Sequence, residues 1–182
     1  MNKAISAEII ENARKKAVQL LDNSGIFLTT EEKDNLEIAS LGLGMLEQIG
    51  IQLHTYLSTK RCSAKEIVLF PGQICPEHRH PPIEGGPGKE ETFRVRWGEM
   101  YLYVPGVAVE KSSMKASIPQ GKEDTFTVFH EIVLRRGEQY TLEPDTLHWF
   151  CGGPEGLVVS EFSTYNRDDL DIFTDSEIDR TA

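Results

Sequence analysis

Four residues of the types that bind divalent metal ions suggest the chemistry of this chain: His78, His80, Glu91 and His148. His78 and His80 are separated by one residue at the end of an apolar run, and side chains alternate between the two faces of a strand. Both imidazoles should therefore point to the same face. A carboxylate and a third imidazole from other strands would complete a divalent-metal site of the nitrogen/oxygen type. Since the chain has only 5 histidines, such a grouping of three is unlikely to arise by chance.

Three neutral imidazoles and one carboxylate leave open positions on an octahedral ion, which two adjacent oxygens of a substrate could fill. We expect Mn²⁺, with Fe²⁺, Co²⁺ or Ni²⁺ as alternatives, because Zn²⁺ is more often held in a four-coordinate site. Strand phase favours Glu91 over Glu90, since Glu91 shares a face with Phe93, Val95 and Trp97, which we predict to point inward. The alternative is that the histidines are hydrogen-bonded core residues that bind no metal.

Length and composition predict one soluble globular domain: 182 residues, 39% hydrophobic and 26% charged. The net charge of -10 argues against nucleic acid or an anionic membrane as a partner, because both require a basic face. The chain has neither the roughly 18 consecutive apolar residues of a membrane span nor a signal peptide. The spacing of Cys62, Cys75 and Cys151 disfavours a disulfide framework, so we expect a reducing compartment, the cytoplasm. Zinc ligation by Cys75 or Cys151 is a weaker alternative to the histidine site.

Two helices are predicted before the metal-binding motifs. The first runs from about Ser6 to Asn23, with apolar residues at three- and four-residue steps and a Gly-containing stop after it. A second begins near Thr29, where Thr29 and Glu32 have the spacing of a capping box, and continues through Ala39. We expect both helices to form a packing surface rather than to carry catalytic residues.

After about residue 50 the pattern changes to short apolar runs separated by glycine, proline and other turn residues. Many short strands at regular spacing indicate a sandwich or a small barrel. We therefore predict an all-β core of residues 51–182 with a helical extension of residues 1–50 packed on it, while Pro105 to Asp124 forms a long surface connection. The predicted strands are Ile51–Leu57, Glu66–Phe70, Glu91–Arg96, Met100–Val104, Thr125–Phe129, Ile132–Leu134, Gln139–Leu142, Leu147–Cys151 and Leu157–Phe162.

The stretch around the first two histidines resembles the first motif of the cupins. Five residues separate Gly72 from the His78-x-His80 pair, and six residues separate Glu91 from Gly98. This resemblance implies a cupin fold, the double-stranded β-helix or jelly-roll barrel, in which these residues hold a metal ion. It also implies a homodimer, because cupins commonly pair through sheet edges.

A second stretch, from Gly137 through Pro144 to His148, resembles the second cupin motif with two departures. It lacks the glycine expected after the proline, and the distance from the proline to the histidine is one residue short. The first motif also departs from the usual spacing, since residues 81–88 insert a segment rich in glycine and proline before Glu91.

The insert before Glu91 points to a particular subfamily. The insert 81–88, the run 89–94 and the run 144–150 are similar to the corresponding parts of D-lyxose ketol-isomerases, as are residues 160–164 and 168–173. The resemblance implies a metal-dependent aldose–ketose isomerase acting on a free sugar. D-lyxose and D-xylulose are the first pair to expect, with D-mannose and D-fructose as the second.

Isomerisation of an aldose moves a proton from C2 to C1 through an enediolate, and a metal holding both oxygens would stabilise the developing charge. Glu161 is our candidate base, because it interrupts the apolar run Leu157–Phe162 and burial there would raise its pKa. Lys89 resembles the lysine that family members place beside the metal, where it would bind a hydroxyl or stabilise charge. The alternatives are a surface-facing Glu161 on an edge strand and a solvated Lys89 in a loop.

Other polar residues have less specific interpretations. Asp168, Asp169 and Asp171 could close over a sugar or form a charged C-terminal surface, whereas His54 and His130 lie outside both motifs and are expected to be structural. Two other functions compete with the isomerase. A cupin dioxygenase would use the same ligands with ferrous iron, and a non-catalytic cupin would bind a sugar without converting it.

Overall fold

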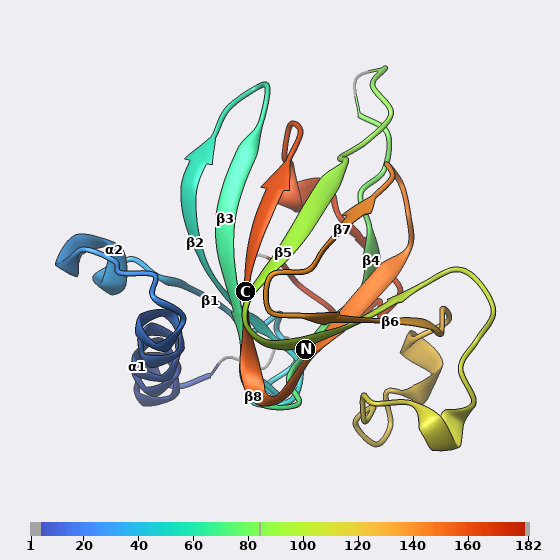
Figure 1. Ribbon diagram of the computed structural model, residues 1–182, viewed down its shortest axis with the longest axis horizontal. Helices are drawn as coiled ribbons and strands as arrows, with labels where there is room; N and C mark the ends of the chain where they lie inside the picture. Colours follow the sequence, from blue (N-terminus) through green and yellow to red (C-terminus); the bar gives the residue numbers. More distant parts are fainter. Residues whose placement is uncertain (1–4, 84, 181–182) are drawn as a thin grey trace.

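The computed structural model describes residues 5–83 and 85–180, which form a curled antiparallel sheet with helices on its outside (Figure 1). The strands follow the order β1-β2-β3-β8-β4-β9, and β5 also pairs with β6, β7 and β8. This is the predicted all-β cupin barrel. Its strands are β1 (Glu37–Ala39), β2 (Ile51–Ser58), β3 (Ser63–Leu69), β4 (Ile74–Arg79), β5 (Glu91–Val104), β6 (His130–Arg135), β7 (Gln139–Leu142), β8 (His148–Ser163) and β9 (Ile172–Phe173).

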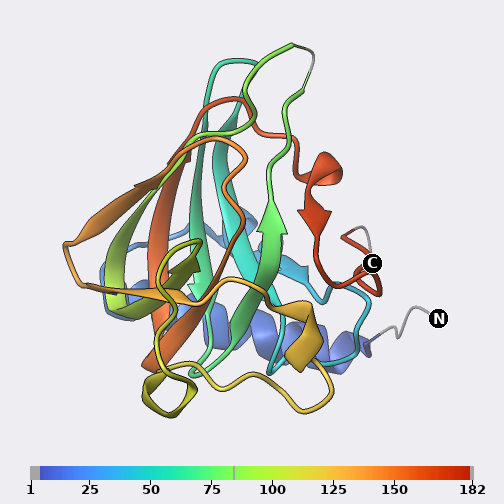
Figure 2. The ribbon, with the colours of Figure 1, turned by 90° about the vertical axis from the view of Figure 1, so that its right-hand side faces the viewer.

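The two long strands β5 and β8 run antiparallel and bend together, which curls the sheet (Figure 2). One end of β8 pairs with β3 and the other end with β4. At the bend Gly98 has a φ of 71°, and a β-carbon there would lie 2.0 Å from the carbonyl oxygen of Gly156, so the strands cross too closely for any side chain. Each of these strands joins two that were predicted separately: Glu91–Arg96 with Met100–Val104, and Leu147–Cys151 with Leu157–Phe162.

The hydrophobic core fills the inside of the curled sheet. Ile67, Leu69, Phe93, Val95 and Phe150 belong to it, and each is at most 3% exposed. These residues alternate along β3, β5 and β8 with residues of the outer face, as half-buried strands require. The polar residues of the same inner face therefore lie next to this hydrophobic core.

Helix α1 (Ala7–Ser24) covers part of the outer face of the sheet, where Ala17 packs in one cluster with Val158. The Ser6 side chain caps its start and Gly25, in the left-handed conformation, ends it, so both predicted ends are confirmed within one residue. Within residues 5–83 and 85–180, none of the helices has the length and apolar character that a membrane crossing requires.

The second predicted helix is correct in its start but wrong in its length. The capping box of Thr29 and Glu32 opens α2 (Thr30–Asp34), which ends after five residues. Residues 37–39 instead form β1 and pair with β2, with Ala39 opposite Ile51. Pairing with the sheet buries Ala39, which a continuing helix would not do, so tertiary contacts override the local pattern.

The strand predicted at Thr125–Phe129 is also wrong. This part of the chain contains a short 3-10 helix, η2 (Glu123–Thr125), followed by an extended segment outside the sheet. The backbone N–H groups of Thr127 and Val128 donate to the carboxylate of Glu77 rather than to a neighbouring strand. The preceding connection contains another short 3-10 helix, η1 (Lys111–Ser113).

Trp97 does not belong to the inward-facing set in which it was predicted. The register of β5 against β8 shifts between Val95 and Trp97, and this irregularity reverses the phase of the strand. Glu91, Phe93 and Val95 are buried on the inner side, whereas Trp97 packs with the cluster beneath α1. The phase argument thus holds for Glu91 and fails beyond the bulge.

Candidate active site

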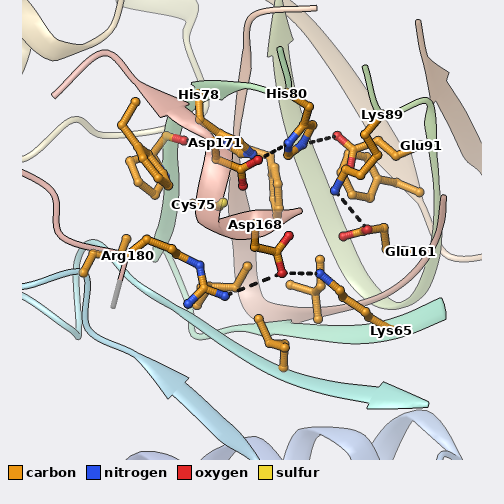
Figure 3. A pocket seen from close by; sticks show the side chains of 18 residues that line it. Lys65, Cys75, His78, His80, Lys89, Glu91, Glu161, Asp168, Asp171 and Arg180 are labelled. Atoms are coloured by element: carbon orange, nitrogen blue, oxygen red, sulfur yellow. Dashed lines mark hydrogen bonds and ion pairs between the residues drawn. The ribbon is translucent and has the colours of Figure 1, made fainter. Parts of the chain in front are cut away.

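The three predicted histidines meet inside the curled sheet. His78 lies in β4 and His80 directly after it, and both point toward the pocket (Figure 3). His78 lies opposite His148 of β8 in the strand register. Their candidate ligand nitrogens all lie within 4.8 Å of one another. The residues are 7%, 6% and 1% exposed, respectively. One ion placed among them could contact all three.

Hydrogen bonds fix which nitrogen of each ring faces this point. The Nδ1 atoms of His78 and His148 lie 2.8 Å and 2.9 Å from the carbonyl oxygens of Pro76 and Thr146. The Nδ1 atom of His80 lies 2.5 Å from a carboxylate oxygen of Asp171. Since a carbonyl or carboxylate oxygen accepts a proton, each Nδ1 carries one, which leaves Nε2 as the nitrogen of each ring that would bind a metal ion.

Glu91 supplies the carboxylate. Its Oε1 atom lies 3.0 Å from Nε2 of His148 and 3.2 Å from Nε2 of His80, while Oε2 lies 2.7 Å from the Lys89 ammonium. Burial alone would raise the pKa of Glu91, but Lys89 and His80 outweigh it and hold the pKa well below its usual value. The carboxylate is therefore ionised and directed at the histidines.

These residues fit a divalent metal ion. Nε2 of His148 is buried without a hydrogen-bond partner, although Oε1 of Glu91 lies 3.0 Å away. With the proton of His148 on Nδ1, two lone pairs face each other, and a cation bound to both would remove that repulsion. Three imidazole nitrogens with one carboxylate oxygen form a donor set suited to Mn²⁺, Fe²⁺, Co²⁺ or Ni²⁺.

Lys89 and Glu161 form an ion pair beside the histidines. The Lys89 ammonium lies 3.1 Å from Oε1 of Glu161, and both residues are 4% exposed. Burial lowers the pKa of Lys89, but the carboxylates of Glu161 and Glu91 outweigh this effect and raise it above its usual value. Glu161 therefore faces a cation, which differs from the purely apolar setting expected from its sequence.

The long insert before Glu91 is what brings Lys89 to this position. It connects β4 to β5, and Gly88 near its end has a φ of 98°. A β-carbon at Gly88 would lie 2.5 Å from the carbonyl oxygen of His80, so the loop returns against the strand that carries the histidines. Lys89 follows directly and points into the pocket between Glu91 and Glu161 (Figure 3).

Four further charged residues line the same pocket and were not assigned a firm role from the sequence: Lys65, Asp168, Asp171 and Arg180. The Lys65 ammonium lies 2.6 Å from Asp168, and Arg180 lies 3.9 Å from Asp168 on another side. Lys65 could have been found, because alternation places it on the same face as Ile67. The sequence offers no such signal for Arg180, which joins the site through tertiary contacts.

The pocket has both charged and apolar lining residues. It encloses about 500 Å³ of empty space with its mouth included. Its apolar lining comes from Leu41, Ile51, Leu53, Phe93 and Phe150, beside the imidazoles and ion pairs. A small molecule that carries both hydroxyl groups and C–H groups could contact both kinds of lining residue.

Several other candidates lie away from the metal-binding group. Cys75 lines the pocket as a buried thiol whose pKa is raised by burial, and Cys151 lies in a separate cluster with its pKa raised to about 12 by burial. His54 lies 3.5 Å from a carboxylate oxygen of Glu32. His130 lies 3.0 Å from the carbonyl oxygen of Val107. Asp169 forms an ion pair with Arg167 rather than facing the pocket.

Fold and site together define a cupin with a three-histidine, one-carboxylate centre beside a buried lysine–glutamate pair. The family model for D-lyxose isomerase matches residues 36–182. The D-lyxose ketol-isomerase of Thermofilum sp. is 52% identical over 176 residues, covering 97% of each chain. The D-lyxose/D-mannose isomerase of Thermosediminibacter oceani is 53% identical and covers 94% of this chain and 93% of its own. This chain belongs to the D-lyxose isomerase family.

Solved structures with the same fold include more distant sugar isomerases. The L-ribose isomerase of Cellulomonas parahominis superposes with a TM-score of 0.77, covering 98% of this chain and 96% of its own at 18% identity. The L-ribose isomerase of Acinetobacter sp. gives a TM-score of 0.76 at 17% identity, with 96% and 94% covered. Both extend over the helical N-terminal part as well as the barrel, so the arrangement of elements is shared throughout.

Proposed function

We propose that this protein is a metal-dependent aldose–ketose isomerase that interconverts D-lyxose and D-xylulose, with D-mannose and D-fructose as a second pair. The observation that carries the proposal is the position of the Lys89–Glu161 ion pair next to the three imidazoles, in a member of the D-lyxose isomerase family. An isomerase of this kind requires a cation for the oxygens on two adjacent carbons and a base within reach of those two carbons, C1 and C2.

His78, His80, Glu91 and His148 would hold the metal ion, for which we propose Mn²⁺. When bound, this ion supplies electrostatic stabilisation of the negative charge that develops on the sugar oxygens at C1 and C2. The four side chains are preorganised for this task, because three rings are fixed by hydrogen bonds and Glu91 is oriented by Lys89.

We propose that Glu161 takes the proton from C2 and returns it to C1. Its carboxylate lies in the pocket and is oriented by Lys89, which pairs with Glu91 at the same time. Lys89 stays protonated, because the two carboxylates raise its pKa, so it cannot act as the base. Its ammonium group would instead donate to a sugar oxygen as charge builds on the enediolate.

The pocket suits a neutral sugar better than a sugar phosphate. Lys65 and Arg180 are the further cations of the pocket, and each is already paired: Lys65 with Asp168, and Arg180 with Glu37 at 2.6 Å. A phosphate would have to displace these carboxylates, whereas hydroxyl groups can both donate to a carboxylate and accept from an ammonium. The ion pairs therefore support a polyhydroxy substrate without added charge.

We further propose that the protein works as a homodimer in the cytoplasm. Leu57 and Phe162 are 47% and 51% exposed on the outer face of the sheet and flank Ala64 in the strand register, which leaves an apolar patch available to a second copy. Cys62, Cys75 and Cys151 are all free thiols, as expected in a reducing compartment. Light scattering during gel filtration tests the dimer directly.

The proposed activity is tested by removing metal and adding it back. The chelated protein should convert no D-lyxose, and Mn²⁺ should restore the formation of D-xylulose under nitrogen. If none of Mn²⁺, Co²⁺, Ni²⁺ or Fe²⁺ restored ketose formation, the proposed isomerase activity would be overturned. Oxygen consumption by the iron-loaded protein, measured in parallel, would instead indicate a dioxygenase.

A further inference from the structure

The three histidines of the metal centre are not anchored alike. His78 and His148 each contact a backbone carbonyl two residues earlier in the chain, whereas His80 contacts the carboxylate of Asp171, 91 residues later. A carbonyl is a neutral acceptor, while a carboxylate makes a charge-assisted hydrogen bond that draws the Nδ1 proton and makes Nε2 a stronger ligand. We therefore expect Nε2 of His80 to be the strongest of the three proposed nitrogen ligands.

Asp171 is held in place by strand pairing. It lies between the 3-10 helix η3 (Asp168–Leu170) and β9, and β9 pairs with β4 so that Phe173 is opposite His78 (Figure 2). The side chain of Asp171 is only 8% exposed and points at His80 from the rim of the pocket (Figure 3). The neighbouring Thr174 also holds this segment against β4, because its N–H and its hydroxyl group both donate hydrogen bonds to Glu77.

The other carboxylates of the pocket pair with lysines, and Glu91 faces the Nε2 atom of His80 rather than its Nδ1 atom. Lys65 pairs with Asp168, and Lys89 pairs with both Glu91 and Glu161. Among the carboxylates that line this pocket, Asp171 is thus the one that contacts the Nδ1 atom of a proposed metal ligand. The contact between Asp171 and His80 is not needed to hold β9 in the sheet, because the backbone of β9 already pairs with β4.

We propose that Asp171 is a positioning residue of the metal centre, which orients His80 and strengthens it as a ligand, so that the C-terminal segment Asp168–Thr174 sets the metal affinity. This inference rests on the proposed metal ligands but not on the identity of the sugar. It makes the affinity for metal depend on a segment that contributes none of the proposed metal ligands.

The test measures the Mn²⁺ dissociation constant of the full-length protein by competition with a chelator. Asp171→Asn keeps an oxygen that can accept from Nδ1 but removes the charge, so Mn²⁺ should bind roughly 10-fold more weakly. Asp171→Ala removes the acceptor as well and should weaken binding by roughly 100-fold. Asp169→Asn, on the same segment but facing Arg167, is the matched control and should bind Mn²⁺ like the parent protein.

A second control separates positioning from simple loosening of the segment. Thr174→Val removes one bond between the segment and Glu77 without touching His80. If loosening alone were responsible, Thr174→Val would weaken metal binding as much as Asp171→Asn, and that result would overturn the proposal. Unchanged Mn²⁺ affinity in Asp171→Asn would overturn it as well.

Spectra of the cobalt-substituted protein give an independent readout. The visible absorption bands of Co²⁺ should shift in Asp171→Asn and stay unchanged in Thr174→Val, since only the first alters a ligand's electron density. Identical spectra in both variants would contradict the positioning role. Because these measurements need no sugar, they can succeed even if D-lyxose is not converted, which would count against the proposed function alone.

Discussion

Two buried glutamates, Glu77 and Glu91, lie on opposite sides of the strand that carries the histidines, and their surroundings differ sharply. Glu77 is 0% exposed and accepts four hydrogen bonds, from the N–H and Oγ1 of Thr127, the N–H of Val128 and the Oγ1 of Thr174. Glu91 is 2% exposed and faces Lys89 and two imidazole nitrogens. Only the first carboxylate is satisfied by neutral hydrogen-bond donors.

This difference separates a structural carboxylate from one that we propose to bind metal. The bonds to Glu77 join β4 to the segment after η2, which lies outside the sheet, and to Thr174 directly after β9, so this carboxylate stabilises the fold. Around Glu91, ionised and lone-pair groups are packed at close range, which is costly for stability without a further cation. Burial alone does not distinguish the two glutamates, whereas the type of partner does.

The largest effect is expected at Glu161, on the functional side of this comparison. Glu161→Gln should lower kcat for D-lyxose by about 1000-fold, since general acid–base catalysis contributes about 10²–10⁴-fold, while metal content stays unchanged. Glu66→Gln is the matched control. Glu66 is also buried, but it lies on the outer face, where burial raises its pKa and Ser160 donates to it. Full activity in Glu161→Gln would remove it as the base.

Glu91→Gln should reduce the affinity for Mn²⁺ by more than roughly 100-fold, because a direct ligand matters more than the outer-shell groups that cost roughly 10–100-fold. The unfolding free energy of the metal-free protein should change little, since Lys89 keeps its pairing with Glu161. Metal analysis and thermal melting test the two statements separately. Glu90→Gln, which alters the exposed neighbour, should leave both quantities unchanged.

The opposite outcome is expected for Glu77. Glu77→Leu leaves the backbone N–H groups of Thr127 and Val128 without an acceptor, so the free energy of unfolding should fall by about 2–3 kcal/mol. The variant that folds should still bind Mn²⁺ with near-normal affinity, because Glu77 points away from the histidines. If the folded Glu77→Leu variant bound Mn²⁺ much more weakly than the parent protein, Glu77 would also affect the metal centre, which would contradict this prediction.

The sequence predicted side-chain direction well where strand alternation applies and poorly where it is interrupted. Alternation correctly predicted that His78 and His80 share a face and that Glu91 rather than Glu90 is buried, because these residues lie in β4 and β5 or directly beside them. The prediction failed for Trp97, where a bulge shifts the phase, and for Thr125–Phe129, where Glu77 replaces a neighbouring strand as the acceptor. Local patterns carry no information about either event.

The residues that the sequence could not place are those brought in by long-range pairing. Asp171 reaches His80 only because β9 pairs with β4, and β9 is two residues long, too short to leave a pattern. Arg180 reaches Asp168 from beyond that strand. Lys65 differs, since it stands on a regular strand in phase with Ile67, and it was missed only because that strand begins earlier than predicted.

The smallest effect is expected where one of the hydrogen bonds to the Glu77 carboxylate is removed. Thr174→Val deletes the hydroxyl that donates to Glu77 at 2.6 Å, but the N–H of Thr174 still donates to the carbonyl oxygen of Glu77 at 3.0 Å. The free energy of unfolding should therefore fall by only about 1 kcal/mol, as for a single hydrogen bond. Chemical denaturation measures this value. Combined with Glu77→Leu, the second substitution should add almost nothing, because its partner is already gone; additive losses would mean that Thr174 stabilises the fold by another route.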